Sequence, residues 1–183
     1  SIAGPSEILV IADQTADPRY VAADLLAQAE HSPGSAILLT TDEALIEGVL
    51  VALRKYLDEL SRSDLAVASL NQYSALVLVQ DMNQAVAFAN RMAPEHLHLQ
   101  IESPNEWVPS LTTAGAVFVG HQTPVALGDY VAGPSHVLPT GATARWASGL
   151  SSNDFLRPSS VIEYEQSGLD IDGIHAQRVA GKE

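Results

Sequence analysis

A glutamate and a histidine stand side by side at Glu95 and His96, directly after Pro94. A carboxyl group and an imidazole in one pocket can take a proton from water or from an alcohol near neutral pH. In a regular strand the two side chains would face opposite sides, so they can share a pocket only if Glu95 still belongs to the turn. The pair is a candidate acid/base couple, and an exposed turn is the alternative interpretation.

Three further side chains could bind a metal ion. Gln28 and His31 are three residues apart at the end of an expected helix, where the helix dipole favours a cation. Asp129 lies in a glycine-rich turn and offers the oxygen that a divalent ion prefers. Each residue also has a simpler interpretation. Glutamine is an uncommon metal ligand, His31 can cap the carboxyl end of its own helix, and Asp129 can stabilise the turn in which it lies.

The composition excludes several classes of function. The 183 residues are 46% hydrophobic, which suffices for one well-packed domain, and none is cysteine. Disulfides, cysteine-bound zinc and a thiol nucleophile are excluded, so an aldehyde would have to be oxidised after direct attack by water. The net charge of −13 argues against binding to nucleic acid or to an anionic membrane. No apolar run approaches the length of a membrane span, and we expect a cytoplasmic protein.

The apolar pattern predicts strands and helices in alternation, which is typical of an α/β fold with a largely parallel sheet. Ligands of such folds bind outside the carboxyl ends of the strands. The expected strands are 7–12, 35–40, 75–79, 96–101, 114–119 and 160–164. The expected helices are 18–30, from the Asp42 cap to about 58, and 82–92, and a long ordered loop is expected over 120–149.

Common cofactor and hydrolase motifs are missing from the sequence. No G-x-G-x-x-G follows an expected strand, and neither H-E-x-x-H nor G-x-S-x-G occurs. A dinucleotide site is therefore not indicated by these residues.

Taken together and in order, several segments resemble the carboxyl-terminal part of L-histidinol dehydrogenase, over nearly all of residues 1–164. The similar stretches are Ala-Gly-Pro-Ser-Glu-Ile-Leu-Val-Ile-Ala-Asp (3–13), Ala-Ala-Asp-Leu-Leu-Ala-Gln-Ala-Glu-His (22–31), Asn-Arg-Met-Ala-Pro-Glu-His-Leu (90–97), a long glycine-rich stretch (120–140) and Thr-Ala-Arg-Trp-Ala-Ser-Gly-Leu-Ser (143–151). The resemblance implies a Rossmann-like three-layer domain.

The resemblance also implies an activity. Histidinol would be oxidised through histidinal to histidine, the last two steps of histidine biosynthesis, with reduction of two NAD molecules by a zinc-dependent homodimer. By the same resemblance, Gln28, His31 and Asp129 bind zinc and contact the substrate.

Roles for the acid/base pair follow from the resemblance as well. His96 contacts the substrate and accepts its hydroxyl proton, and Glu95 activates the water that attacks the aldehyde. Ser6 is a further substrate contact.

The chain also departs from the family. Family members are much longer, and their NAD contacts lie in an amino-terminal portion that is absent here, as expected for an internal fragment that begins with Ser1. We therefore expect the chain alone not to turn over NAD. The family's fourth zinc ligand, a histidine that reaches the partner subunit, has only a shortened counterpart around His175, which is left out of the expected ligands.

The expected organisation is a zinc- and substrate-binding domain over 1–164 and a polar tail over 165–183. Two alternatives remain open. One is a non-catalytic module that binds zinc or a small ligand, and the other is a zinc-dependent hydrolase that uses Glu95 on a metal-oriented water.

Overall fold

The computed structural model describes residues 4–31, 33–60 and 63–182. It contains two compact units, Ser1–Ser151 and Ser152–Glu183, and each is described by itself. The division falls earlier than the boundary expected after residue 164. All of the predicted catalytic, metal-binding and substrate-binding residues belong to the first unit.

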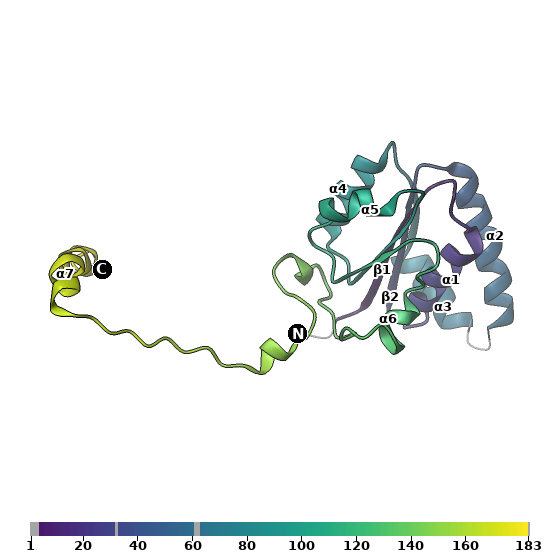
Figure 1. The fold of residues 1–183 in the computed structure, drawn as a ribbon. Helices are drawn as coiled ribbons and strands as arrows, with labels where there is room; N and C mark the ends of the chain where they lie inside the picture. Colours follow the sequence, from purple (N-terminus) through teal and green to yellow (C-terminus); the bar gives the residue numbers. More distant parts are fainter. Residues whose placement is uncertain (1–3, 32, 61–62, 183) are drawn as a thin grey trace. The chain divides into compact units, whose positions relative to one another are not determined.

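A five-stranded sheet forms the centre of the first unit (Figure 1). The strand order is β3-β2-β1-β4-β5, and every neighbouring pair is parallel. This arrangement confirms the predicted α/β fold. The strands are β1 (Ser6–Ala12), β2 (Gly34–Thr40), β3 (Ala75–Leu78), β4 (His96–Gln100) and β5 (Ala116–Val119), each close to its predicted position.

Aspartate caps define where the main helices begin. The side chains of Asp17, Asp42 and Asp81 each accept a backbone N–H from the first turn that follows, which satisfies a donor that the helix itself leaves unpaired. The helices of the first unit are α1 (Pro18–Ala29), α2 (Glu43–Glu59), α3 (Ser63–Tyr73), α4 (Met82–Met92), α5 (Pro104–Trp107) and α6 (Ala126–Tyr130).

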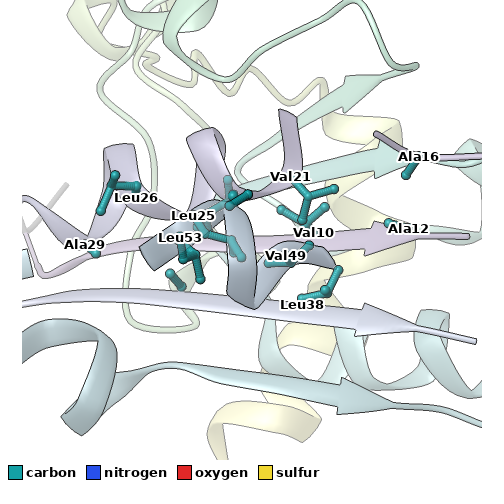
Figure 2. Packing of buried hydrophobic residues seen from close by; sticks show 14 of the residues in the cluster. Val10, Ala12, Ala16, Val21, Leu25, Leu26, Ala29, Leu38, Val49 and Leu53 are labelled. Carbon is teal, nitrogen blue, oxygen red and sulfur yellow. The ribbon is translucent and has the colours of Figure 1, made fainter. Parts of the chain in front are cut away.

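The helices cover both faces of the sheet and make three layers (Figure 1). On one face, strand residues such as Val10 and Leu38 pack against Leu25 of α1 and Val49 of α2, and α3 adds to the same cluster (Figure 2). On the other face, Leu97 and Leu99 of β4 pack with α4, α5 and their flanking residues. Because β1 and β2 are buried on both sides, their sequences read as continuous apolar runs.

A polar seam runs between α1 and β4 inside the otherwise apolar layer. Asp24 of α1 and His98 and Gln100 of β4 are all buried. The Asp24 Oδ2 atom lies 2.6 Å from His98 Nδ1 and accepts a hydrogen bond from Gln100 Nε2 at 3.3 Å. His98 Nε2 donates to the Gly120 carbonyl at 3.0 Å, because a carbonyl oxygen can only accept. The seam therefore fixes α1 against β4 through directional bonds.

Two expectations about secondary structure were wrong. The strand expected over 160–164 is irregular and exposed, because among the described residues no neighbouring strand pairs with it. Helix α3 was not predicted, because its fully buried residues are the small Ala66 and Ser69, while Leu65, Val67 and Tyr73 are exposed. The loop expected over 120–149 is mostly irregular but contains α6 and a short 3₁₀ turn, Thr143–Arg145.

The second unit contains helix α7 (Gln166–Ala180), which occupies most of the expected polar tail. Tyr164 donates a hydrogen bond to Asp172 across the start of the helix, and Gln166 donates to Asp170 one turn later. His175 belongs to this helix. Across the described part of the chain, no helix is both long and apolar enough to cross a membrane.

The seam yields a stability prediction. Asp24→Ala should lower the free energy of unfolding by about 3–5 kcal/mol, because His98 and the Gln100 amide lose their acceptor in a water-free interior. Urea denaturation followed by circular dichroism measures the effect. Arg19→Ala removes the exposed ion pair with Asp17 and should leave the transition nearly unchanged. Equal effects of the two substitutions would contradict this account of the seam.

Candidate functional site

The candidate residues gather at the amino edge of the sheet. Glu95 directly precedes β4 and His96 begins it, while Gln28 and His31 lie at the carboxyl end of α1, which runs back along the sheet. Ser6 begins β1 and is paired with Gly34 at the same edge. The candidate residues therefore lie at the edge opposite to the carboxyl ends of the strands, where ligands of such folds were expected.

Glu95 and His96 do share one pocket. The C-cap of α4, Ala93, has the left-handed conformation with φ at 52°, so the chain turns sharply and Glu95 still lies outside the regular strand. Both side chains are buried, and Glu95 Oε2 lies 3.5 Å from His96 Nδ1. The exposed-turn interpretation does not apply to this pair.

The backbone of Glu7 orients both members of the pair. Its N–H donates to Glu95 Oε2 at 3.0 Å, and its carbonyl oxygen lies 3.2 Å from His96 Nδ1. Since the carbonyl can only accept, Nδ1 carries the proton and Nε2 keeps a free lone pair. The orientation of the imidazole thus leaves Nε2 as the atom that can accept a proton.

The surroundings raise the pKa of Glu95 and lower the pKa of His96. Burial raises the pKa of Glu95 to about 7, opposed by the Glu7 N–H and supported by the carboxylates of Glu7 and Asp129. Burial lowers the pKa of His96, although the Glu7 carbonyl and Asp129 act in the opposite direction. A carboxyl group and an imidazole tuned in this way can exchange protons under physiological conditions.

Gln28, His31 and Asp129 line one cavity of about 660 Å³. Gln28 is buried, and its Oε1 atom has no hydrogen-bond partner among the described residues. Asp129 of α6 also lines a second cavity of about 560 Å³ together with His96 and His136. Asp129 therefore connects the metal-type side chains to the acid/base pair.

The structure describes no cluster of three or more His, Cys, Asp or Glu residues that could hold a metal ion within 4–31, 33–60 and 63–182. The predicted ligand set contains only two residues of these types, His31 and Asp129, and a glutamine. The buried, unpartnered oxygen of Gln28 is the feature of this structure that suits a bound cation.

Glu7 is the part of the site that sequence reasoning missed. Its own carboxylate accepts a hydrogen bond from the Gly141 N–H at 3.3 Å, and burial raises its pKa. In the sequence Glu7 reads as the start of an apolar strand, and no spacing relates it to a residue 88 positions away. Only the pairing of β1 with β4, which places Ile8 opposite His96, brings it to the site.

Comparison with known proteins agrees with the α/β architecture. A family model described as histidinol dehydrogenase matches residues 1–183, and the chain belongs to this family. Histidinol dehydrogenase of Rhodopirellula baltica is 53% identical over 183 residues, and that of Desulfotalea psychrophila is 50% identical over the same length. The crystal structure of histidinol dehydrogenase from Elizabethkingia anophelis superposes with a TM-score of 0.87 at 40% identity and covers 98% of this chain.

These relatives are considerably longer than the chain. The whole chain matches only 40% and 42% of the length of the two relatives, and 98% of it matches 42% of the chain of known structure.

The raised pKa of Glu95 predicts a pH-dependent stability. The folded protein keeps this proton up to about pH 7, whereas the unfolded chain releases it near the ordinary glutamate pKa of 4.5, so stability is lost as the pH rises through this window. Glu95→Gln removes that loss and should gain on the order of 2–3 kcal/mol over the wild type between pH 4.5 and pH 8.

Urea midpoints of both proteins across this pH range measure the difference. Glu47→Gln, on the exposed side of α2, is the matched control and should follow the wild type. A constant difference between Glu95→Gln and the wild type at all pH values would refute the assignment.

Proposed function

We propose that this chain is the zinc- and substrate-binding, carboxyl-terminal portion of a histidinol dehydrogenase. The complete enzyme oxidises L-histidinol through L-histidinal to L-histidine with two NAD, acts in the cytoplasm and is a homodimer. The observation that supports this most is the shared pocket of Glu95 and His96, connected through Asp129 to Gln28 and His31. Membership of the histidinol dehydrogenase family names the substrate for such a pocket.

Gln28, His31 and Asp129 are the residues that would hold the zinc ion. The unpartnered Gln28 Oε1 atom, the imidazole of His31 and the Asp129 carboxylate offer a mixed oxygen and nitrogen donor set. When bound, zinc would polarise and orient the amino alcohol. The nearby carboxylates of Glu7 and Glu95 also favour positive charge at this edge.

Each of the two oxidations uses a different member of the acid/base pair. In the first, His96 Nε2 takes the hydroxyl proton while the hydride leaves for NAD, whose binding residues lie mostly outside this chain under the proposal. In the second, Glu95 takes a proton from the water that attacks the aldehyde, and a second hydride then leaves. Ser6 lies at the same edge as a substrate contact.

The division of roles predicts different effects on zinc. His31→Asn removes a ligand and should weaken zinc binding by more than about tenfold, because even residues that only orient a ligand commonly cost that much. Glu95→Gln should leave zinc binding unchanged. Equilibrium dialysis with metal analysis measures both variants on the chain itself.

In the complete enzyme, Glu95→Gln should slow the oxidation of added histidinal by about 100-fold or more, because the attacking water loses its base. The oxidation of histidinol to histidinal should change less. Equal loss of zinc from both variants, or equal slowing of both steps, would refute the assignment.

The length of the relatives gives a further prediction. The isolated 183-residue chain should bind zinc yet form no NADH from histidinol, because it lacks the cofactor contacts that the proposal places elsewhere. Absorbance at the NADH band, with a full-length relative as the positive control, measures this. Histidinol-dependent NADH from the isolated chain would contradict the placement of the NAD site. If the natural gene encodes a protein of only this length and that protein binds zinc, the alternative of a non-catalytic module would be favoured.

A further inference from the structure

One wall of the cavity around His96 is a loop, residues 137–150, that folds back on itself. The Leu150 N–H donates to the Val137 carbonyl at 2.9 Å and closes the base of this 137–150 loop. Three of its residues line the cavity of about 560 Å³ that also contains His96, namely Leu138, Gly149 and Leu150. The contacts that hold the loop in place therefore also shape the candidate active site.

The tip of the loop packs against the segment that leads into β1. Pro139 and Thr140 are the buried residues of the loop. A Cβ atom at Gly4 would lie 2.4 Å from Thr140 Oγ1, so the absence of a side chain at Gly4 permits this approach. Next to Thr140, Gly141 and Ala142 both have the left-handed conformation, with φ at 60° and 62°, and the chain reverses there. The tip is thus a tight turn that lies at the amino edge of the sheet.

The side chain of Glu7 binds this turn. The Gly141 N–H lies 3.3 Å from each carboxylate oxygen of Glu7 and donates to the carboxylate. Burial raises the pKa of the Glu7 carboxyl group, and hydrogen bonds from the Gly141 and Glu95 backbones act in the opposite direction. Among the described residues, no Lys or Arg forms an ion pair with Glu7. Because a half-buried carboxylate without a cation costs free energy, its backbone partners are the contacts that suit it to this position.

Glu7 reaches the loop from a position beside the acid/base pair. Its backbone N–H lies 3.0 Å from Glu95 Oε2, and its carbonyl oxygen lies 3.2 Å from His96 Nδ1. The residue before it, Ser6, is the proposed substrate contact. Glu7 therefore contacts the acid/base pair through its backbone and the loop through its side chain.

We propose that Glu7 is a positioning residue for the reaction: its carboxylate anchors the tip of the 137–150 loop and so keeps one wall of the cavity beside His96 in place for the substrate. The inference rests on the proposed function, which supplies the substrate. Glu7 acts through the loop and does not touch the reacting atoms, because its carboxylate already accepts from a backbone N–H. An amide oxygen in the same position can accept the same hydrogen bond.

Two substitutions of Glu7 test the anchor on the 183-residue chain. Glu7→Ala removes the acceptor, so the amides of 140–147 should exchange with deuterium about fivefold faster or more than in the wild type. Glu7→Gln keeps an acceptor and should restore most of the protection. Hydrogen exchange with mass spectrometry measures both variants, and peptides from β2 should exchange as in the wild type in each.

Controls separate the anchor from a general loss of structure. Glu47→Ala, on the exposed side of α2, is the matched control and should exchange like the wild type. Glu7→Leu fills the same place without an acceptor, and it replaces Glu7→Ala if circular dichroism shows that Glu7→Ala unfolds. Unchanged exchange of the loop in the variant without an acceptor, or equally fast exchange in Glu7→Gln, would overturn the anchor.

The complete enzyme tests whether the anchor serves the reaction. Glu7→Ala should raise the KM for histidinol about fivefold or more, lower kcat less and leave the zinc content unchanged, because the cavity wall is loosened while the acid/base pair keeps its backbone contacts. Glu7→Gln should restore most of the KM. A loop that exchanges faster with an unchanged KM, or a fall in kcat alone, would overturn the positioning role. Absence of histidinol oxidation by the wild-type complete enzyme would overturn the proposed function, and with it the role in this reaction, while the exchange result still decides the anchor.

Discussion

The hydrogen-bonded pair of Asp24 and His98 is the interaction on which the placement of the site depends. It joins the middle of α1 to the middle of β4 at 2.6 Å, in a layer where most other contacts are apolar and permit sliding or rotation. A directional bond at this point fixes the rotation of the helix. Gln28 follows Asp24 by four residues and so continues along the same helix face, and His31 lies in the turn just after the helix ends. His96 precedes His98 by two residues and shares its face of the sheet. The pair thus sets which side chains meet at the amino edge.

The amino edge is also the electrostatically suitable place for a cation. Helices α1 and α4 both end there, and their carboxyl ends carry the negative pole of the helix dipole. The carboxylates of Glu7, Glu95 and Asp129 add negative charge, which is one reason why the pKa of Glu95 is raised. The carboxyl edge, where helices begin, instead suits anions such as phosphates. The site that we propose for zinc and an amino alcohol therefore lies at the edge opposite to the one that nucleotide-binding folds use.

The sequence was informative where burial alone determines structure. Continuous apolar runs identified β1 and β2, and aspartate caps marked the starts of α1 and α2, because these signals are local. The geometry of Glu95 could not be read in this way, since it depends on the left-handed backbone of Ala93, which most residues other than glycine avoid. His98 read equally well as part of an amphipathic strand, and its partner Asp24 lies 74 residues away. Buried polar contacts between distant segments are decided by the packing of α1 on the sheet, and no local pattern encodes them.

The seam also explains how helix α1 can contribute polar side chains at both edges of the sheet. Asp24 satisfies His98, the Gln100 amide and the Val125 N–H together, so the middle of the seam is closed to ligands. Beyond this middle part, two buried amide oxygens have no hydrogen-bond partner among the described residues, Gln28 Oε1 at the amino edge and Gln100 Oε1 toward the carboxyl edge. An unpaired acceptor in the middle would cost about 1–3 kcal/mol with nothing to compensate it, whereas one at a cavity can be satisfied by what binds there. The positions of the two glutamines are therefore the part of this packing that folding alone does not explain.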